Sequence, residues 1–447
     1  MRQRITNATI VEDGERFKGS LLIEDGIIAD IAREGNILPG WLSDPGIEET
    51  NAGGMLLLPG VIDDHVHNRE PGLTHKADMD SETRAAAAGG VTSVFDMPNV
   101  VPQTTSLKLL EERYLLAGEK CHVNYAFYLG ATADNIDDIR NIDTTRVPGI
   151  KLFMGSSTGN MLVDKEESLR AIFKACPGIL MTHCEDTSRI NRRIAEVQAR
   201  YDGDYDNIRH HAEVRDHDAC YDSTSLAVRL ARETGCRLHV AHLSTARELS
   251  LFAPGDSQVT AEACVAHLLF CDEDYDTLGA RIKCNPSVKG SIDRDALREA
   301  CRDGRIRIIA TDHAPHLLEE KRGGYLKAVS GMPMVQYSLP AVLTLCDEGA
   351  MTIERAVELM CHNPAELFGV DRRGHILPGY HADLVLLSHT KWTVTAGSVL
   401  SKCHWSPLEG RTLNWKVERT LVNGRCVWDG KRIDPSVYGE CVRFKAF

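Results

Sequence analysis

The chain has 447 residues, with 64 acidic and 51 basic side chains that give a formal net charge of −13. Apolar residues make up 43% and charged residues 26%, which is typical of a globular protein and excludes a disordered chain or a coiled coil. The acidic excess and the lack of a Lys/Arg-rich block argue against nucleic-acid binding, and weakly against an anionic substrate.

The 14 cysteines are scattered without a C-x-x-C pair, so they indicate free thiols rather than a disulfide framework. No run approaches the roughly 18 apolar residues that a membrane span needs. The opening stretch MRQRITNATIVEDG lacks the apolar core of a secretory signal. We therefore expect a cytoplasmic protein that does not insert into a membrane.

The predicted elements change character along the chain. Residues 4–32 and 376–430 carry short alternating runs broken by Asp-Gly and Asn-Gly, a pattern typical of β-hairpins. Between them, Val/Ile-rich runs alternate with helical stretches such as SETRAAAAGG, which favours a parallel α/β architecture. We predict a small β-sandwich domain built from both chain ends, residues 1–58 plus 370–447, and a barrel domain of residues 59–369.

Eight runs are candidate barrel strands: VIDDHV (61–66), VTSVFDM (91–97), HVNYAFY (122–128), GIKLF (149–153), ILMTH (179–183), RLHVAH (237–242), QVTAE (258–262) and RIRIIATD (305–312). Eight strands that alternate with helices predict a (β/α)8 TIM-type barrel. In such barrels the active site lies at the carboxyl ends of the strands.

The first candidate strand ends in the run Asp63-Asp64-His65-Val66-His67. Side chains two residues apart point to the same face of a strand, so His65 and His67 lie side by side and could supply half of a metal site. Taken alone, such a pair is more often a surface or core feature than a metal site.

Further residues of metal-ligand type stand at the ends of later strands: Lys151, His183, His242 and Asp312. Each alone has an ordinary structural explanation, such as a buried histidine bonded to the backbone or an aspartate that caps the next helix. Their convergence from several strands is what a barrel active site requires.

Lys151 needs a separate hypothesis, because an ammonium group repels metal cations. A lysine amine that has added carbon dioxide is a carbamate, an anion whose two oxygens can bridge two metals. Two metals bridged in this way would share a water with a lowered pKa.

Several motifs resemble the amidohydrolase superfamily over nearly the whole chain, above all PGVIDDHVHNREPG (59–72) and TDHAPH (311–316). RAAAAGGVTSVFDMPN (84–99), HCED, HVAHLST, VTAE and NPS support the resemblance, which is to the cyclic-amidohydrolase branch with its dihydroorotases, allantoinases and hydantoinases. It implies a hydrolase with two Zn²⁺ per chain, bridged by N6-carboxylated Lys151. The implied metal ligands are His65, His67, Lys151, His183, His242 and Asp312.

Three details resemble the dihydroorotases in particular. Arg69 in the run HNREPG stands where that family binds the substrate carboxylate, and Asn99 and His316 imply two further contacts to it. Guanidinium, amide and imidazole groups can all donate hydrogen bonds to one carboxylate. The alternative role of Arg69 is a salt bridge at the barrel rim. The resemblance implies further substrate contacts from Asn285, Ser330 and Gly331.

The implied reaction is the reversible cyclisation of N-carbamoyl-L-aspartate to L-dihydroorotate in pyrimidine biosynthesis, with Asp312 as the catalytic proton carrier. The chain departs from the family pattern at 286–289 and 331–336, which affects the contacts to the ring. The alternatives are an allantoinase, a hydantoinase or dihydropyrimidinase, and a non-catalytic scaffold. The resemblance also implies a homodimer. Residues 313–330 are either a mobile loop over the site or a solvated charged loop, and His239 and His313 are expected to be structural.

Overall fold

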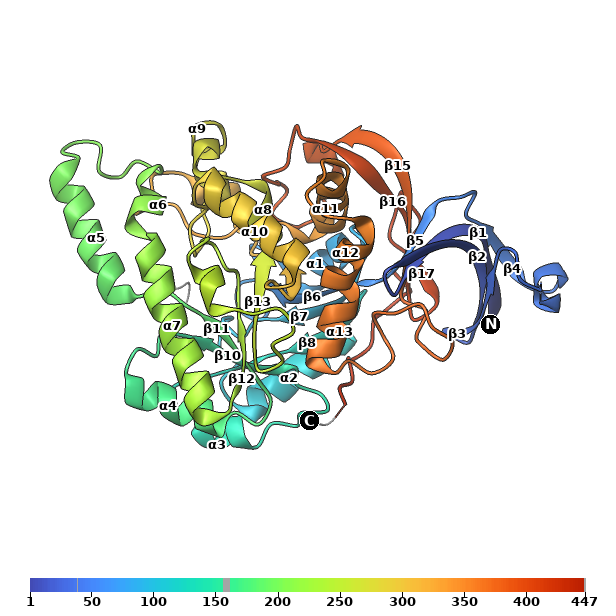
Figure 1. Ribbon diagram of the computed structural model, residues 1–447, viewed down its shortest axis with the longest axis horizontal. Helices are drawn as coiled ribbons and strands as arrows, with labels where there is room; N and C mark the ends of the chain where they lie inside the picture. The colour runs from blue at the N-terminus through green and yellow to red at the C-terminus, as the bar shows by residue number, and fades with distance from the viewer. Residues whose placement is uncertain (38, 156–160, 446–447) are drawn as a thin grey trace.

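The computed structural model describes residues 1–37, 39–155 and 161–445, and Figure 1 shows a helix-covered barrel beside a strongly curved sheet. The barrel strands are β6 (Val61–Val66), β7 (Val91–Asp96), β8 (Asn124–Phe127), β9 (Leu129–Gly130), β10 (Gly149–Phe153), β11 (Ile179–His183), β12 (Arg237–Val240), β13 (Val259–Cys264) and β14 (Ile308–Ala310). All of their pairings are parallel.

The third barrel strand is interrupted. β8 pairs with β7 and β9 pairs with β10, and only Tyr128 stands between them, so both are parts of one strand position. A parallel bridge between Val66 and His313 joins the first and last strand positions. The described residues therefore form eight strand positions in a closed barrel, as the sequence predicts.

Helices follow the strands and cover the barrel from outside (Figure 1). Several begin at a side-chain cap: Asp78 and Asp216, for example, accept from backbone amides in the first turns of their helices. The helices are α1 (Met79–Ala88), α2 (Leu107–Gly118), α3 (Ile136–Arg140), α4 (Glu166–Ala175), α5 (Thr187–Arg200), α6 (His210–Val214), α7 (His217–Thr234), α8 (Val265–Leu269), α9 (Tyr275–Leu278), α10 (Ser291–Asp303), α11 (Ser338–Asp347), α12 (Ile353–Val357) and α13 (Asn363–Phe368).

A single buried apolar cluster joins barrel strands that are far apart in sequence. It includes Phe95 of β7, Met181 of β11 and Ile308 of β14, together with Tyr128 and with Phe368 of α13. Phe368 packs edge-on against Phe95, with ring centroids 5.3 Å apart. Because these strands lie on different sides of the barrel, the cluster occupies its interior and supports the polar site above it.

Both chain ends contribute to the second sheet. Its strands are β1 (Arg2–Glu12), β2 (Glu15–Glu24), β3 (Ile27–Arg33), β4 (Glu48–Asn51), β5 (Leu56–Pro59), β15 (Leu384–Thr393), β16 (Thr412–Val422) and β17 (Arg425–Trp428). Their order is β17-β16-β15-β5-β1-β2-β3, and β4 pairs with β1. The antiparallel pairing of β5 with β15 joins the two ends of the chain. Hairpin turns at Asp13-Gly14 and Asn423-Gly424 have positive φ at both residues, as the sequence pattern predicts.

Not all of the C-terminal part lies in this sheet. Between β15 and β16 the chain returns to the barrel, where Trp405 Nε1 donates to the backbone oxygen of His316 at 2.7 Å. Lys402 Nζ pairs with Asp78 at 2.7 Å. The segment around Trp405 therefore supports the loop that follows β14.

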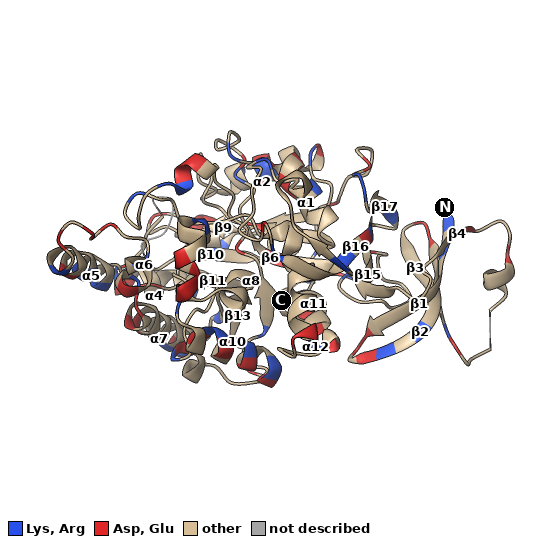
Figure 2. Cartoon of the chain, turned by 90° about the horizontal axis from the view of Figure 1, so that it is seen from above, with Lys and Arg blue, Asp and Glu red and all other residues tan. Residues whose placement is uncertain are grey.

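Acidic and basic side chains are mixed over the outer helices (Figure 2). Arg170 of α4, for example, pairs with Glu166 and Glu233, at 3.1 and 2.5 Å. No helix in the described ranges has both the length and the apolar character that crossing a membrane demands.

Candidate active site

The first candidate metal-binding group lies where β6 and β14 end. Nε2 of His67 and Nε2 of His65 lie 3.0 and 3.3 Å from the same oxygen, Oδ1 of Asp312. Burial lowers the pKa of His67 to about 4, so its ring stays neutral and keeps a lone pair for a metal. Burial acts to raise the pKa of Asp312, but the two imidazoles outweigh it and hold that pKa below its usual value.

The second group lies at the ends of β11 and β12. Nδ1 of His183 is 3.0 Å from Nε2 of His242, and both rings are buried. Nδ1 of His242 has no hydrogen-bond partner among the described residues. Burial lowers the pKa values of both imidazoles, so both are neutral and available to a metal.

Two residues of these groups have unusual backbone conformations. His242 and Asp312 have φ values of +39° and +47°, in the left-handed region that residues with a Cβ rarely adopt. Each follows the last residue of its strand by two positions. Such strain is commonly stored at functional sites, where surrounding contacts fix the side chain.

Lys151 of β10 is completely buried, and its Nζ has no hydrogen-bond partner among the described residues, although it lies 5.4 Å from the centre of the Phe153 ring. Burial lowers the pKa of this amine, which favours the neutral form that reacts with carbon dioxide. Burying an amine without a hydrogen-bond partner costs free energy. A carbamate whose charge is neutralised by two cations avoids that cost. The residues therefore fit a metal pair bridged by carboxylated Lys151.

Carboxylates behind the ligands were not singled out from the sequence. Glu262 Oε1 accepts from His65 Nδ1 at 2.6 Å and from the His242 backbone N–H at 2.9 Å. Glu185 lies 3.1 Å from His183 Nε2 and also pairs with Arg215. Carboxylates in these positions orient metal-binding imidazoles. The sequence did contain a signal for these carboxylates, because Glu262 lies in the motif VTAE and Glu185 lies in the motif HCED.

A second layer of buried polar groups lies below Glu262. His239 Nδ1 is 2.8 Å from the hydroxyl of Thr260, and His239 Nε2 is 3.5 Å from Asp64 and 3.6 Å from Glu262. Asp63 accepts from the hydroxyl of Thr311 at 2.6 Å. The structure thus gives His239 polar partners within the barrel, and the structural role expected for it stays a prediction.

Arg69 lies beside the first metal-binding group with its φ at +65°. Nε of Arg69 donates to the oxygen of Pro315 at 3.0 Å, and Nη2 is 3.0 Å from Nε2 of His316. Lys76 Nζ is 3.1 Å from the other ring nitrogen of His316 and also pairs with Glu320 at 2.6 Å. Burial and the neighbouring cations hold the pKa of His316 far below its usual value, so the ring is neutral.

Of the residues predicted to contact substrate, all but His316 line a small cavity of about 30 Å³ between the metal-binding groups and the loop after β14. Asn99 Oδ1 lies 2.8 Å from His67 Nδ1, and the Ser330 hydroxyl donates to Asn285 Oδ1 at 3.0 Å. Both backbone groups of Gly331 are already bonded, to Lys283 and Lys321. The cavity is lined by His65, His67, Arg69, Asn99, His183, His242, Asn285, Asp312, Ala314, Ser330 and Gly331. Lys151 and His316 are not among the lining residues.

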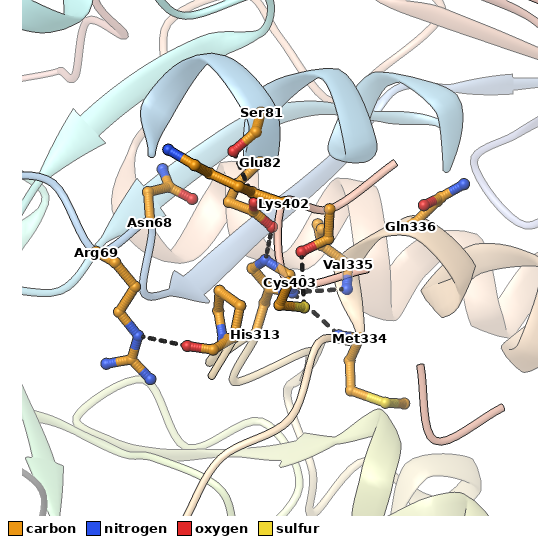
Figure 3. A network of polar contacts seen from close by, with 12 residues as sticks. Asn68, Arg69, Ser81, Glu82, His313, Met334, Val335, Gln336, Lys402 and Cys403 are labelled. Carbon is orange, nitrogen blue, oxygen red and sulfur yellow. Dashed lines mark hydrogen bonds and ion pairs between the residues drawn. The ribbon is translucent and has the colours of Figure 1, made fainter. Parts of the chain in front are cut away.

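The loop after β14 is anchored at its start by His313 (Figure 3). His313 Nε2 lies 2.8 Å from Glu82 of α1, and its Nδ1 accepts from the backbone amides of Met334 and Val335 at 3.0 and 3.3 Å. Glu82 also accepts from the amide of Lys402 at 3.0 Å. His313 therefore joins the start of this loop to the backbone of residues 334–335 at its far end, and the structural role expected for it stays a prediction.

A parallel barrel whose strand ends gather four histidines, a lysine and an aspartate defines a metal-dependent hydrolase. Residues 56–427 match the model of the amidohydrolase family, and the chain belongs to this family. It is 34% identical to a dihydroorotase of Halobacterium salinarum, over 92% of this chain and 96% of that protein. It is 29% identical to an allantoinase of Bacillus velezensis, over 97% and 96% of the two chains.

Among solved structures, an L-hydantoinase (dihydropyrimidinase) from Arthrobacter aurescens is similar over 99% of this chain and 100% of its own. The TM-score is 0.92 and the sequence identity 27%. The predicted (β/α)8 fold is thereby confirmed, and so is the class of enzyme, a cyclic amidohydrolase. The relatives include dihydroorotases, allantoinases and hydantoinases, so they define the reaction class more closely than the substrate.

Proposed function

We propose that this cyclic amidohydrolase is a dihydroorotase, which interconverts N-carbamoyl-L-aspartate and L-dihydroorotate in pyrimidine biosynthesis. The observation that carries the proposal is the buried guanidinium of Arg69, which lies next to the cavity with Lys76 on the far side of His316. Burying this guanidinium costs free energy unless an anion pairs with it. A substrate with a ring carboxylate supplies that anion, whereas a neutral ring does not.

In this proposal the two histidine pairs, Asp312 and carboxylated Lys151 would hold two Zn²⁺ ions. The unpaired Nζ of Lys151 and Nδ1 of His242 are buried atoms that fit this assignment. When bound, the zinc pair would activate a water and polarise the amide carbonyl of the ring. A ligand set of imidazoles and carboxylates suits zinc.

The side chains of the chain itself supply proton transfer and orientation. Asp312, with its low pKa, is ionised at neutral pH and so can accept a proton and return it to the leaving ring nitrogen. Arg69, Asn99 and His316 would bind the carboxylate, and Asn285, Ser330 and Gly331 would contact the ring. Holding the ring in one orientation makes the attack nearly unimolecular.

The deciding experiment is a steady-state assay of the purified enzyme on dihydroorotate, allantoin, dihydrouracil and hydantoin, with zinc content measured on the same sample. We expect a kcat/KM for dihydroorotate that exceeds that for each neutral ring. Turnover of allantoin or a hydantoin without turnover of dihydroorotate would reject the proposal and support the allantoinase or hydantoinase alternative. A zinc-free protein that stays inert after zinc is added would support a non-catalytic scaffold.

Three further predictions belong to this proposal. We infer a homodimer, a cytoplasmic location, and a division of the chain into a composite domain, residues 1–58 plus 370–447, and a barrel of residues 59–369. Residues 446–447 lie outside the described part of the chain. Sedimentation of the purified enzyme tests the dimer.

A further inference from the structure

One wall of the active-site cavity lies between two buried lysines. Lys321 is 5% exposed and Lys283 is 6% exposed. Lys321 Nζ donates to the backbone oxygens of Val329 and Gly331 at 2.7 and 2.6 Å, and Lys283 Nζ donates to the oxygen of Ala328. Three carbonyl groups within four consecutive residues therefore accept hydrogen bonds from ammonium groups.

The same lysines join this wall to a second lining segment. Lys321 Nζ also donates to the backbone oxygen of Lys283 at 3.1 Å, and that oxygen accepts from the Gly331 N–H at 2.9 Å. Two residues beyond Lys283, Asn285 lines the cavity and accepts from the Ser330 hydroxyl. The segments 283–285 and 328–331 are thus bonded into one unit with Lys321 at its centre.

These lysines are expensive to bury. Across the described ranges neither ammonium forms an ion pair, so backbone carbonyls alone replace its water. Burial lowers the pKa of Lys321 to about 7 and that of Lys283 to about 8. An apolar side chain would fill the same space at a lower cost in free energy. We therefore attribute the lysines at these positions to the hydrogen bonds that their ammonium groups donate.

The backbone of this wall is also closely packed at Gly331. Gly331 has φ at +125°, and a Cβ built on it would lie 2.8 Å from the Cβ of Ala314 and 3.1 Å from the ring of His316. The backbone at 331 is therefore held against the loop that carries His316. A small shift of the wall would change the distance between Ser330 and any molecule in the cavity.

We propose that Lys283 and Lys321 are positioning residues, a lysine clamp that fixes the wall of residues 328–331 at the distance that the substrate ring requires. The clamp contacts no residue assigned to the metals, so it sets the KM for substrate rather than the zinc content. The expected effect of the clamp on KM rests on the proposed function of the active site. Its expected effect on the backbone of residues 328–331 does not.

The test compares the variants Lys321→Met and Lys283→Met with the matched control Lys327→Met, an exposed lysine in the same loop. Amide hydrogen exchange is measured without substrate on the zinc-loaded enzyme. We expect the Val329 and Gly331 amides, which donate to Glu320 and Lys283, to exchange on the order of tenfold faster in Lys321→Met and unchanged in the control.

Kinetics are measured on whichever ring the wild-type enzyme turns over best. We expect KM to rise on the order of tenfold in Lys321→Met, with a smaller change in kcat and the same zinc content. Exchange and KM equal to those of Lys327→Met, or loss of zinc from the variant, would overturn the clamp. If Lys321→Met fails to fold, Lys321→Gln, which keeps one donor, takes its place, and its wall amides must exchange faster than those of the wild type. If the enzyme does not turn over dihydroorotate, the amide hydrogen exchange of the wall residues still tests the clamp.

Discussion

The carboxylate of Glu262 lies 2.6 Å from Nδ1 of His65, and the same oxygen accepts from the backbone of His242. One atom of β13 therefore contacts a candidate ligand from each of the two candidate metal-binding groups. It also supports the strained backbone of His242, whose φ is +39°. Although burial acts to raise the pKa of Glu262, His65 and His239 hold it well below its usual value, so the group is ionised.

We expect Glu262→Gln to weaken zinc binding by about 10–100-fold, because the amide keeps the shape but loses the charge that orients His65. Competition with a chromophoric chelator measures the affinity. The visible spectrum of the cobalt-substituted enzyme reports ligand geometry independently of activity.

Glu248→Gln is the matched control for Glu262. Glu248 is equally buried but bonds to Thr224 and Thr245 instead of a metal-binding residue. Equal zinc affinity in the two variants would show that Glu262 acts only as a core residue.

Lys151→Ala should abolish turnover and lower zinc content, because the bridging anion is lost. Short carboxylates such as acetate should restore part of both, since they can occupy the space left by the carbamate. Activity and zinc content are measured with and without acetate, and the wild type should not respond. A Lys151→Ala enzyme with full zinc content would contradict the bridging role.

Arg69→Met should raise the KM for dihydroorotate about 10–100-fold, since each hydrogen bond to a charged group contributes about 1.5–3 kcal/mol. kcat should change less, because the guanidinium binds the substrate at a distance from the amide that reacts. Arg84→Met, in which a surface pair with Asp80 is removed, is the control. A KM equal to that of the control would leave Arg69 as a rim residue.

Glu12 of β1 should stabilise the junction between the composite sheet and the barrel. Its carboxylate lies 2.8 Å from His375 Nδ1, accepts from the Ile376 amide at 2.7 Å and lies 3.3 Å from His362 Nε2. Burial acts to raise the pKa of Glu12, but hydrogen bonds to the two histidines outweigh it and lower the pKa to about 2. The usual value is 4.5.

A lowered pKa means that Glu12 stabilises the folded state at pH values above 4.5 and that this contribution is lost as the pH falls towards 2. Glu12→Gln should therefore lower the free energy of unfolding by about 3 kcal/mol near neutral pH, and less in acid. Urea unfolding of the two proteins at several pH values measures the difference. Glu15→Gln, at an exposed pair with Arg33, should show no such dependence.

The barrel was predictable because short Val/Ile-rich runs alternate with helical stretches, and β6, β10 and β11 have the predicted bounds. The convergence of the candidate metal ligands was predictable because Lys151, His183 and Asp312 stand at or near strand ends, whereas their binding of a metal stays a prediction. The roles of Glu262 and Glu185 were not predictable. The sequence pattern of a carboxylate near a strand end is the same whether the carboxylate binds a metal, orients a ligand or caps a helix.

The lysine clamp could not be predicted from the sequence for a different reason. Lys283 and Lys321 lie in irregular segments without periodicity, and a charged residue in a loop predicts exposure. Their burial depends on the path of the loop between residues 313 and 331, which tertiary contacts such as Trp405 to His316 determine. The interruption of the third barrel strand at Tyr128 is likewise a tertiary feature.

The pairing of β5 with β15 has a consequence for synthesis. A ribosome releases β1 to β5 long before β15 exists, so until then the nascent chain carries an unpaired sheet edge beside the strand that leads into the barrel. Contacts so distant in sequence form slowly. The segment translated after the barrel therefore completes the sheet and also places Trp405 beneath the active-site loop, so a chain terminated before β15 would expose the β5 edge to aggregation.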